Sequence, residues 1–302
     1  MAYDVSSLTD FVDQSDLKLL KKTQFDKKTA GLVQTVTGVK SAKALPLIDN
    51  QVVFQSDTCG TTASGSTTIS QRNVTVGAIQ IFQSFCPKTL NAKATQYALK
   101  PGSDQESMPF EEYFTNTLAG GIGEALETAD WQGNTSSTNK NLNKYNGFLT
   151  VASASLSTIS GSVSGSNPSA SVAAITTIYN AIPTALLGKD DTTIFTGQDF
   201  FRLYTQGLTQ LNLFHYAPNA SEGEYYVPGT NIKVVAVDGL NSTNRVFATR
   251  LSNMFIGVDL ESDEDEFKIW YSNDDDDVKC RVSLKRGTQV AYPNEVVLYT
   301  IQ

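Results

Sequence analysis

Residues 108–133 read MPFEEYFTNTLAGGIGEALETADWQG and predict one long helix. Pro109 suits the first helical turn, where its missing N–H removes no hydrogen bond, and Gly133 is typical of a helix end. Over 109–132 such a helix is about 36 Å long, roughly the width of a small domain, so we expect it to be the spine of the fold. Apolar side chains recur at every fourth position, which places them on one face of the helix: Phe110, Phe114, Leu118, Ile122 and Leu126.

The middle of this spine helix contains the glycine-rich run 120–123 (GGIG). A dinucleotide-binding loop needs its glycines in a turn between a strand and a helix, with another glycine three residues on. Leu126 occupies that later position, and the apolar period continues through the run. A mid-helix glycine costs about 1 kcal/mol relative to alanine. We therefore interpret the run as a packing feature and predict no cofactor-binding residue in it.

The composition of the chain is that of a globular protein. Its 302 residues are enough for one large domain or two ordinary ones. No apolar run approaches the roughly 18 residues of a membrane-spanning helix, and the N-terminus (MAYDVSSLTD) starts polar and acidic, unlike a secretory signal. The formal net charge of −8 disfavours tight binding to nucleic-acid phosphates.

The cysteines and the single histidine predict no metal site and no nucleophilic site. Cys59, Cys86 and Cys280 have unrelated spacings without a CxxC pair, so we expect free thiols. A Cys59–Cys86 bridge across a hairpin stays open as an alternative. His215 is the only histidine and lies between two aromatic residues. A serine–histidine–aspartate site would have to use it, and no GxSxG elbow is present, so a structural role is the simpler interpretation.

Carboxylates are concentrated in two runs, 259–266 (DLESDEDE) and 274–277 (DDDD). Oxygen ligands of this kind suit calcium, yet the calcium-loop pattern of alternating acids with a central glycine and a terminal glutamate is absent. We interpret both runs as solvated turns whose repulsion keeps strand edges from pairing wrongly. No acid/base pair follows from the spacing. The sequence therefore predicts no catalytic, cofactor-binding or metal-ligating residue, and a protein that is not an enzyme.

An extended hairpin is predicted over residues 51–86. Val52–Phe54 is expected to form a short strand, 57–66 (DTCGTTASGS) a tip rich in small polar residues, and 68–85 a long alternating return strand. Because a two-stranded ribbon is barely stable alone, we expect it to lie on another surface. Residues 1–50 carry short helical patterns with little apolar content and are expected to form an arm.

The rest of the chain mixes predicted helices and strands, and no internal repeat is visible. Helices are expected at 88–100, 172–187 and 198–208, with a polar loop at 134–146. The small-residue segment 150–174 is expected to be a domain boundary or a connecting loop. Strands are predicted at 192–196, 232–237, 245–251, 254–258, 267–271, 278–284, 289–293 and 296–301.

Two groups of segments carry a family resemblance. In the C-terminal part they are RLSNMFIGVDL (250–260), IWY (269–271) and KRGTQV (285–290). Upstream they are CG (59–60), SQRNVTVG (70–77), CP (86–87), PFEE (109–112), WQG (131–133) and NLNK (141–144). Together these segments resemble the major capsid proteins of tailed bacteriophages, which have the Hong Kong 97 fold. The resemblance covers nearly the whole chain and rests on patterns of packing and turns.

The resemblance implies an α+β, Hong Kong 97-like capsid fold. Its parts are an N-terminal arm, an extended β-hairpin loop, a peripheral domain with the long spine helix, and an axial domain around a central sheet. Some relatives carry a cleaved scaffolding extension; here the arm begins at Met1, so we expect a separate scaffolding protein or none. The expected bounds are 1–50 for the arm, 51–86 for the extended loop, 87–174 with 257–287 for the peripheral domain, and 175–256 with 288–302 for the axial domain.

The function implied by the resemblance is structural. A major capsid protein self-assembles through pentamers and hexamers into an icosahedral-type shell that encloses the double-stranded DNA genome of a tailed phage. Implied partners are other copies of the chain, portal, scaffolding and decoration proteins, and DNA enclosed without sequence-specific binding; no membrane is involved. The implied location is the virion, with the host cytoplasm during assembly. Two alternatives stay open: an encapsulin-like shell of a protein compartment, and a β-rich phage surface or tail protein.

Overall fold

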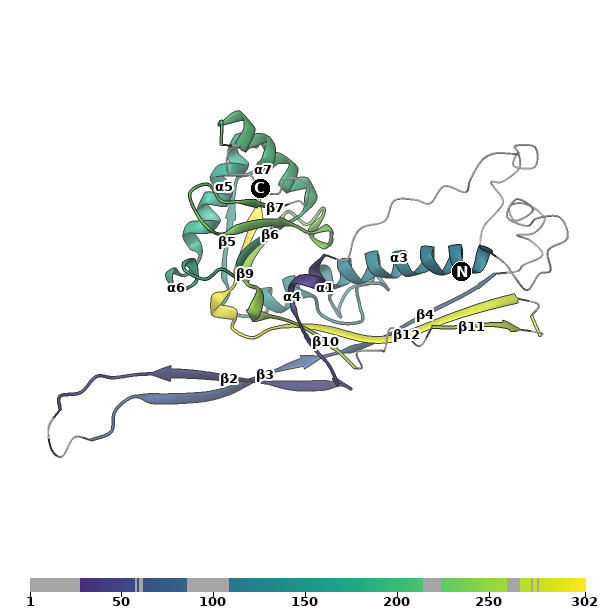
Figure 1. The fold of residues 1–302 in the computed structure, drawn as a ribbon, viewed down its shortest axis with the longest axis horizontal. Helices are drawn as coiled ribbons and strands as arrows, with labels where there is room; N and C mark the ends of the chain where they lie inside the picture. The colour runs from purple at the N-terminus through teal and green to yellow at the C-terminus, as the bar shows by residue number, and fades with distance from the viewer. Residues whose placement is uncertain are drawn as a thin grey trace.

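The computed structural model describes residues 28–57, 59, 62–85, 109–213, 224–259, 267–272, 274–275 and 277–302. The short helices expected before residue 28, the helix expected at 88–100 and His215 lie outside the described residues. The described chain forms a five-stranded sheet, a six-stranded sheet and a two-stranded ribbon. Figure 1 shows the ribbon and the five-stranded sheet as long, drawn-out elements, and the six-stranded sheet with its helices as a lobe beside them.

The predicted spine helix is present as α3, Pro109–Gln132, so its expected bounds are confirmed. It lies along the five-stranded sheet (Figure 1). The apolar stripe of the helix packs on the strands in one cluster: Leu118, Ile122 and Leu126 from α3, with Ile79, Ile81, Val278, Cys280, Val282 and Leu284 from the sheet.

The glycine-rich run 120–123 lies inside this helix. The helix continues through it without a turn, and Gly123 is buried. Because a phosphate-binding loop requires its glycines in a turn before a helix, the run cannot serve as one. This agrees with its interpretation as a packing feature.

The five-stranded sheet is built around β12, Asp277–Val290. The predicted strand 278–284 is too short, because in the structure β12 continues through Gly287 to Val290. A Cβ atom on Gly287 would lie 2.0 Å from the carbonyl oxygen of Thr75, so only glycine permits the close approach of that neighbouring segment. The order is β1 (Gln34–Val36), β10 (Met254–Val258), β12 and β11 (Phe267–Ser272), with β4 (Gly77–Phe85) also paired to β12.

The two-stranded ribbon is made of β2, Ala42–Gln51, and β3, Ser66–Thr75. It differs from the hairpin predicted over 51–86. Val52–Phe54 is not a strand, and the first strand of the ribbon lies in the part of the chain expected to be an arm. This segment was expected to be an arm because it has few apolar residues. Both faces of β2 are largely exposed, so the strand does not need the apolar residues that would have identified it.

The predicted return strand 68–85 is divided between two partners. Its first half, β3, completes the ribbon, whereas β4 leaves the ribbon and pairs antiparallel with β12 from Val278↔Phe85 to Arg286↔Gly77. Polar and apolar residues alternate through both halves. This alternation indicates which face of the strand a residue occupies, but it does not indicate which strand is the partner. The change of partner therefore has no signature in the sequence pattern.

The six-stranded sheet forms the core of the second lobe. Helices α5 (Pro168–Ala181) and α7 (Gln198–Gln210) bury apolar side chains against it. All five residues of the central strand β6 are buried. The strands predicted at 192–196, 232–237, 245–251 and 296–301 are confirmed to within one residue at each end. The order is β5 (Ile159–Val163), β13 (Val297–Ile301), β9 (Arg245–Arg250), β6 (Thr192–Thr196), β8 (Lys233–Ala236) and β7 (Glu224–Tyr226).

The loop predicted at 150–174 is wrong, because this segment contains regular structure. Helix α4 (Phe148–Ser153) and strand β5 lie in it, and β5 pairs parallel with β13 in the six-stranded sheet. Asn167 caps α5 by accepting a hydrogen bond from the backbone N–H of Ala170 at 2.8 Å. The segment was predicted to be a loop because it is rich in serine and small residues. Such residues also occur in edge strands and at helix caps, which is where the structure places them.

Two further expected elements have different bounds. The helix predicted at 172–187 is interrupted after Ala181, because Pro183 cannot continue it, and α6 (Thr184–Leu187) follows as a separate turn. Residues Gln289 and Val290 of the predicted strand 289–293 are the end of β12, and the chain then turns through a 3-10 segment, Pro293–Glu295. No helix in the part of the chain that the structure describes is long and apolar enough to cross a membrane.

Candidate assembly surfaces

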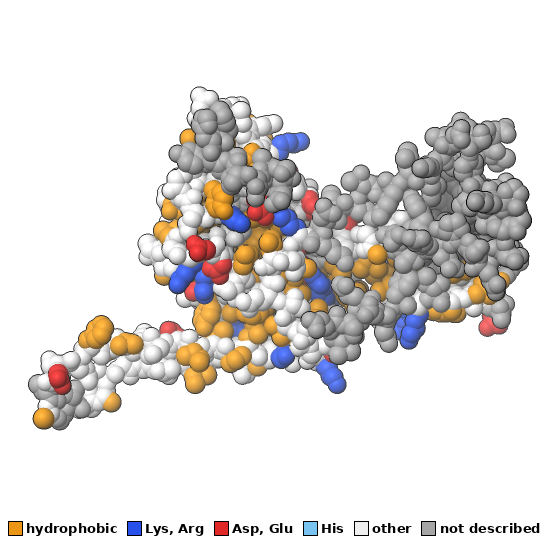
Figure 2. Space-filling view, viewed as in Figure 1, with side chains coloured by type: hydrophobic (Ala, Val, Ile, Leu, Met, Phe, Trp, Pro, Cys, Tyr) orange, Lys and Arg blue, Asp and Glu red, His pale blue; other side chains and the backbone are white. Residues whose placement is uncertain are grey.

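The ribbon exposes apolar side chains that its own subunit does not cover. Ile48 on β2 lies opposite Ile69 on β3, and they are 63% and 74% exposed. Phe54, just beyond the end of β2, is 97% exposed. Figure 2 shows hydrophobic side chains on the surface of the ribbon where it projects from the body of the molecule. Ile48 and Ile69 face each other across the two strands, and exposed apolar surface of this kind marks an interaction site.

The root of the ribbon is fixed to the five-stranded sheet. Val74 on β3 is fully buried, and Gln289 Nε2 donates a 2.7 Å hydrogen bond to the carbonyl oxygen of Asn73. A Cβ atom on Gly77 would lie 1.9 Å from the carbonyl oxygen of Lys144, so β4 passes in direct contact with the loop that follows α3. The direction in which the ribbon leaves the body is therefore set by close backbone contacts at its root.

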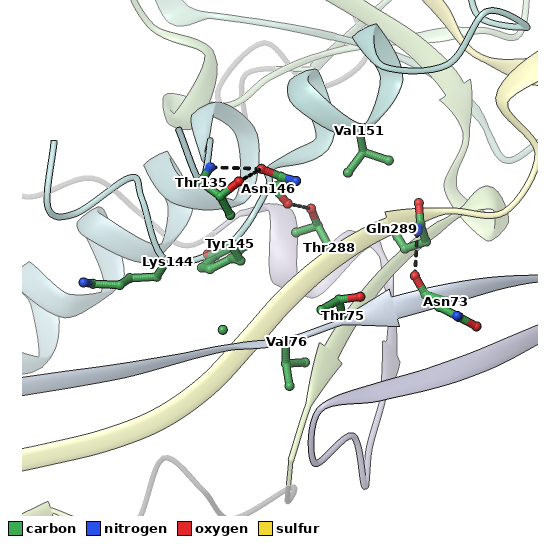
Figure 3. Close-up of a pocket in the computed structure, with 11 residues that line it drawn as sticks. Asn73, Thr75, Val76, Thr135, Lys144, Tyr145, Asn146, Val151, Thr288 and Gln289 are labelled. Carbon is green, nitrogen blue, oxygen red and sulfur yellow. Dashed lines mark hydrogen bonds between the residues drawn. The ribbon is translucent and has the colours of Figure 1, made fainter. Parts of the chain in front are cut away.

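A small open cavity of about 160 Å³ lies at this root, between β3, β12 and the loop after α3 (Figure 3). Thr135 donates from its backbone N–H to Asn146 Oδ1 at 3.0 Å, and Thr288 Oγ1 donates to the Asn146 carbonyl oxygen at 2.7 Å. The side chains that line the cavity are mainly amides and hydroxyls, with Lys144 the one charged group. The cavity lies where three elements meet.

A buried ion pair lies directly behind the cavity. Asp130 on α3 is 0% exposed and receives two parallel hydrogen bonds from Arg286 on β12, Nε to Oδ1 at 2.8 Å and Nη2 to Oδ2 at 2.6 Å. Tyr145 donates its hydroxyl to Asp130 Oδ1 at 2.7 Å, and burial raises the pKa of this tyrosine well above its usual value. The cluster joins the spine helix, the central strand and the loop after the helix.

Glu127 forms a second buried polar contact one turn earlier on α3. It is 2% exposed, and it holds the first described helix, α1 (Thr29–Leu32). The backbone N–H of Thr29 donates to Glu127 Oε2 at 3.2 Å, the Thr29 hydroxyl donates to Oε1, and Trp131 Nε1 donates to Thr29 Oγ1 at 2.7 Å. Burial raises the pKa of Glu127 from 4.5 to about 7.

Trp131 connects this region to the second lobe. It is fully buried, and its ring lies 5.2 Å from that of Phe195 on β6 and 5.4 Å from those of Phe148 on α4 and Phe247 on β9. Aromatic pairs at such distances add attraction beyond the area they bury. The end of the spine helix is therefore packed against strands of the six-stranded sheet.

The face of the five-stranded sheet opposite α3 is a second exposed surface. Cys280 and Val282 point toward the helix, so the alternate residues of β12 point away from it. In register, Lys268 on β11 and Phe82 on β4 both lie beside Arg281 of β12. Trp270 lies on the same face, with its ring 6.2 Å from that of Phe82. This sheet face combines exposed aromatic rings with cationic side chains.

The residues singled out for chemistry in the sequence form no reactive site among the described residues. Cys59 is an exposed free thiol, so the Cys59–Cys86 bridge is not formed; Cys280 is a buried free thiol. Asp259 forms an ion pair with Lys285 at 2.5 Å. Residues 260–266 of the first acidic run lie outside the described residues.

In the second acidic run, Asp274 and Asp275 lie at the turn between β11 and β12, as expected, and Asp277 is the first residue of β12. Asp275 pairs there with Lys279, and hydrogen bonding to this lysine lowers the pKa of Asp275. Across the described ranges, no group of three or more histidine, cysteine, aspartate or glutamate side chains is arranged to hold a metal ion.

Sequence reasoning missed the buried polar contacts of Glu127 and Asp130. One signal was available. Apolar residues recur at every fourth position of the helix, and Asp130 occupies the position that follows Leu126 in this spacing. A carboxylate on the buried face of a helix requires a partner. The partner Arg286 is 156 residues away, and no local pattern indicates it.

Comparison with known proteins gives matches in structure only. No family model and no curated protein matches the chain. A chain of Gordonia phage Cozz has a TM-score of 0.67 at 10% identity, over 99% of this chain and 94% of that one. The capsid of Myoviridae phage XM1 has a TM-score of 0.62 at 10% identity, over 96% of both chains. The capsid of cyanophage A-1(L) has a TM-score of 0.61 at 14% identity, over 97% of both chains. The chain therefore has the α+β fold of phage capsid chains, as its sequence predicted.

Proposed function

We propose that this chain is the major capsid protein of a tailed bacteriophage, and that it assembles through pentamers and hexamers into an icosahedral-type shell around double-stranded DNA. The likeness in fold to phage capsid chains over nearly the whole length supports this function. The observation that carries it is the projecting ribbon, because Ile48, Ile69 and Phe54 are exposed on it far from the core of the subunit. A single subunit gains nothing from such a ribbon, whereas a shell gains contact area.

The partner of the ribbon is, in this proposal, a neighbouring copy of the chain. The ribbon and its tip carry Lys43, Asp49, Asp57 and Arg72, so their formal charges balance. The sheet face opposite α3 offers exposed rings, those of Phe82 and Trp270, to the apolar side chains of a neighbouring ribbon. Apolar contact favours this pairing. Broad contacts that are individually weak also allow misplaced subunits to dissociate during assembly.

The two lobes would supply different parts of the shell. In the proposed subunit, α3 and the five-stranded sheet form the peripheral domain, and the six-stranded sheet with α5 and α7 forms the axial domain. The grouping of strands into two sheets joined at Trp131 supports this division. The strand β5 then belongs to the axial domain, although its position in the sequence placed it in the peripheral one.

The other partners follow from the same role. A capsid subunit works with portal, scaffolding and decoration proteins, is found in the virion, and is assembled in the host cytoplasm. DNA would be enclosed without sequence-specific binding, and the formal net charge of −8 supports this because it leaves the packaged genome free to slide. The proposed role is structural and requires no catalytic step.

Assembly of the purified chain tests the proposal. We expect light scattering after size exclusion to detect rings or closed particles, alone or with a scaffolding protein, and negative-stain microscopy to show shells. Phe54→Ser should lower particle yield while leaving the melting temperature of the subunit unchanged, since this side chain is 97% exposed. The matched control is Thr68→Ser on β3, which should assemble normally.

The contents of the particles discriminate between functions. Nuclease-protected DNA inside shells formed in infected cells supports a capsid, whereas enclosed protein cargo indicates an encapsulin-like compartment. A chain that stays monomeric under every salt and crowding condition, with and without scaffolding protein, would contradict both.

A further inference from the structure

The segment that leads into the ribbon is attached to the spine helix through one buried carboxyl group. Residues 28–33 contain α1, and the chain runs from there through β1 to the ribbon. Thr29 donates its backbone N–H and its hydroxyl to Glu127, and it accepts the indole N–H of Trp131. Thr29 is 0% exposed and Glu127 is 2% exposed. The contact is therefore isolated from water while this segment remains in place.

Charged and titratable groups approach this contact from several elements. Asp130 on α3 is engaged by Arg286 of β12 and by the hydroxyl of Tyr145. Lys28, at the start of α1, has its Nζ 3.6 Å from Glu224 on β7. On the 3-10 segment Asp238–Leu240, which packs on α3, the Asp238 carboxylate accepts a 3.2 Å hydrogen bond from Asn241. Arg286 is thus paired with Asp130, and Lys28 with Glu224.

These surroundings favour the neutral form of Glu127. Burial is the largest effect and raises the pKa, and the nearby Asp130 carboxylate raises it further. Hydrogen bonds from Thr29 and the charge of Arg286 act in the opposite direction. The result is a pKa of about 7, raised from 4.5. When residues 28–33 leave α3, water reaches the carboxyl group and its pKa returns toward the ordinary value of about 4.3.

We propose that Glu127 is a proton-controlled clasp between the N-terminal arm and the spine helix. With the carboxyl group neutral, residues 28–33 stay docked on α3. With the carboxylate ionised, the charge is held in a buried site, and the docked segment is weakened. Because this segment continues into β1 and the ribbon, the clasp couples proton uptake to the attachment of the ribbon root. It is a property of the single subunit and does not depend on the proposed function.

The direction of the pH dependence follows from linkage. The docked state binds the proton more tightly than the released state, so docking is strongest below about pH 4.5. Docking weakens as the pH rises from there and reaches its lower level above about pH 7, the pKa of the docked group. A shift of this size changes the docking equilibrium by on the order of a hundredfold.

Hydrogen exchange of the full-length subunit, followed by mass spectrometry between pH 5 and pH 8, tests the clasp. After correction for the intrinsic exchange rate, we expect the protection of amides 29–33 to fall by tenfold or more across this range. Amides of β6 should keep their protection. Glu127→Gln mimics the neutral carboxyl group, so its protection at pH 8 should match that of the unmodified chain at pH 5.

Two control substitutions test whether Glu127 is the group that titrates. Glu124→Gln, on the same helix, should keep the full pH dependence. His215→Gln removes the one histidine, whose ordinary pKa lies in the same range, and should also keep it. The clasp is overturned if the unmodified chain shows constant protection at 29–33, or if β6 loses protection equally. It is also overturned if Glu127→Gln remains pH-dependent. If Glu127→Gln does not fold, the clasp is still tested by comparing the pH dependence of protection at amides 29–33 with that at β6 in the unmodified chain.

Discussion

Asp130 and Arg286 are 156 residues apart in the sequence and form a bidentate ion pair in the interior, with Nε–Oδ1 and Nη2–Oδ2 distances of 2.8 and 2.6 Å. Asp130 belongs to the spine helix and Arg286 to the central strand of the five-stranded sheet. Arginine and carboxylate in this fork geometry fix both distance and orientation. The pair therefore sets the register of the helix on the sheet, next to the root of the ribbon.

Removing one partner of this pair should destabilise the subunit strongly. Arg286→Met leaves the Asp130 carboxylate buried and uncompensated, and we expect a loss of about 3–5 kcal/mol in the free energy of unfolding, measured in urea. The matched control is Lys233→Met, which breaks a 3.6 Å pair with Glu224 at a lysine that is 42% exposed. Its expected effect is below about 1 kcal/mol. Equal effects of the two substitutions would contradict a structural role for the buried pair.

The spine helix should depend on Leu126 for its attachment to the sheet. Leu126→Ala removes a buried side chain from the cluster with Val282 and Leu284, and we expect a loss of about 2–5 kcal/mol. Leu156→Ala is the control, because that leucine is fully exposed and should change stability little. Thermal and urea unfolding of both variants provide the test. A small effect of Leu126→Ala would mean that the helix is held mainly by its polar contacts.

The ribbon root should not tolerate a side chain at Gly77. A Cβ atom there would meet the backbone oxygen of Lys144 at 1.9 Å, and backbone cannot move aside as a flexible side chain can. Gly77→Ala should therefore lower subunit stability by about 1–3 kcal/mol through overpacking. Gly188→Ala has open space around its Cβ position and should stay within about 0.5 kcal/mol of the unmodified chain. Crystallography or electron microscopy of Gly77→Ala should show β4 displaced from the loop at Lys144.

The two described thiols should differ sharply in reactivity. Cys59 is exposed, whereas Cys280 is buried against α3, and burial raises the pKa of the Cys280 thiol. Since the thiolate is the reactive form, Cys280 should be alkylated only as fast as the subunit opens, while Cys59 reacts at once. A Cys86→Ser background restricts the measurement to these two thiols. Rapid labelling of both thiols in the folded subunit would contradict the packing of β12 on the helix.

Local pattern was sufficient for most single elements. The four-residue apolar spacing identified α3 to the residue, and short apolar runs identified β6, β8, β9 and β13, because periodicity records which face of an element is buried. It failed at 150–174, where small residues that were interpreted as a loop form an edge strand and a helix cap. The family resemblance supplied the arrangement that these local patterns could not.

What the sequence determined by itself is the spine helix and the strands β6, β8, β9 and β13, since these depend on side chains a few residues apart. Only the tertiary structure determined which strands pair with each other and which polar side chains are partners. It places β4 beside β12 instead of in the ribbon, and Arg286 beside Asp130. It also makes Glu127 a buried anchor for Thr29, 98 residues away in the chain. Such contacts join groups whose separation in sequence carries no periodic signal, and their energies depend on burial that exists only after the chain has folded.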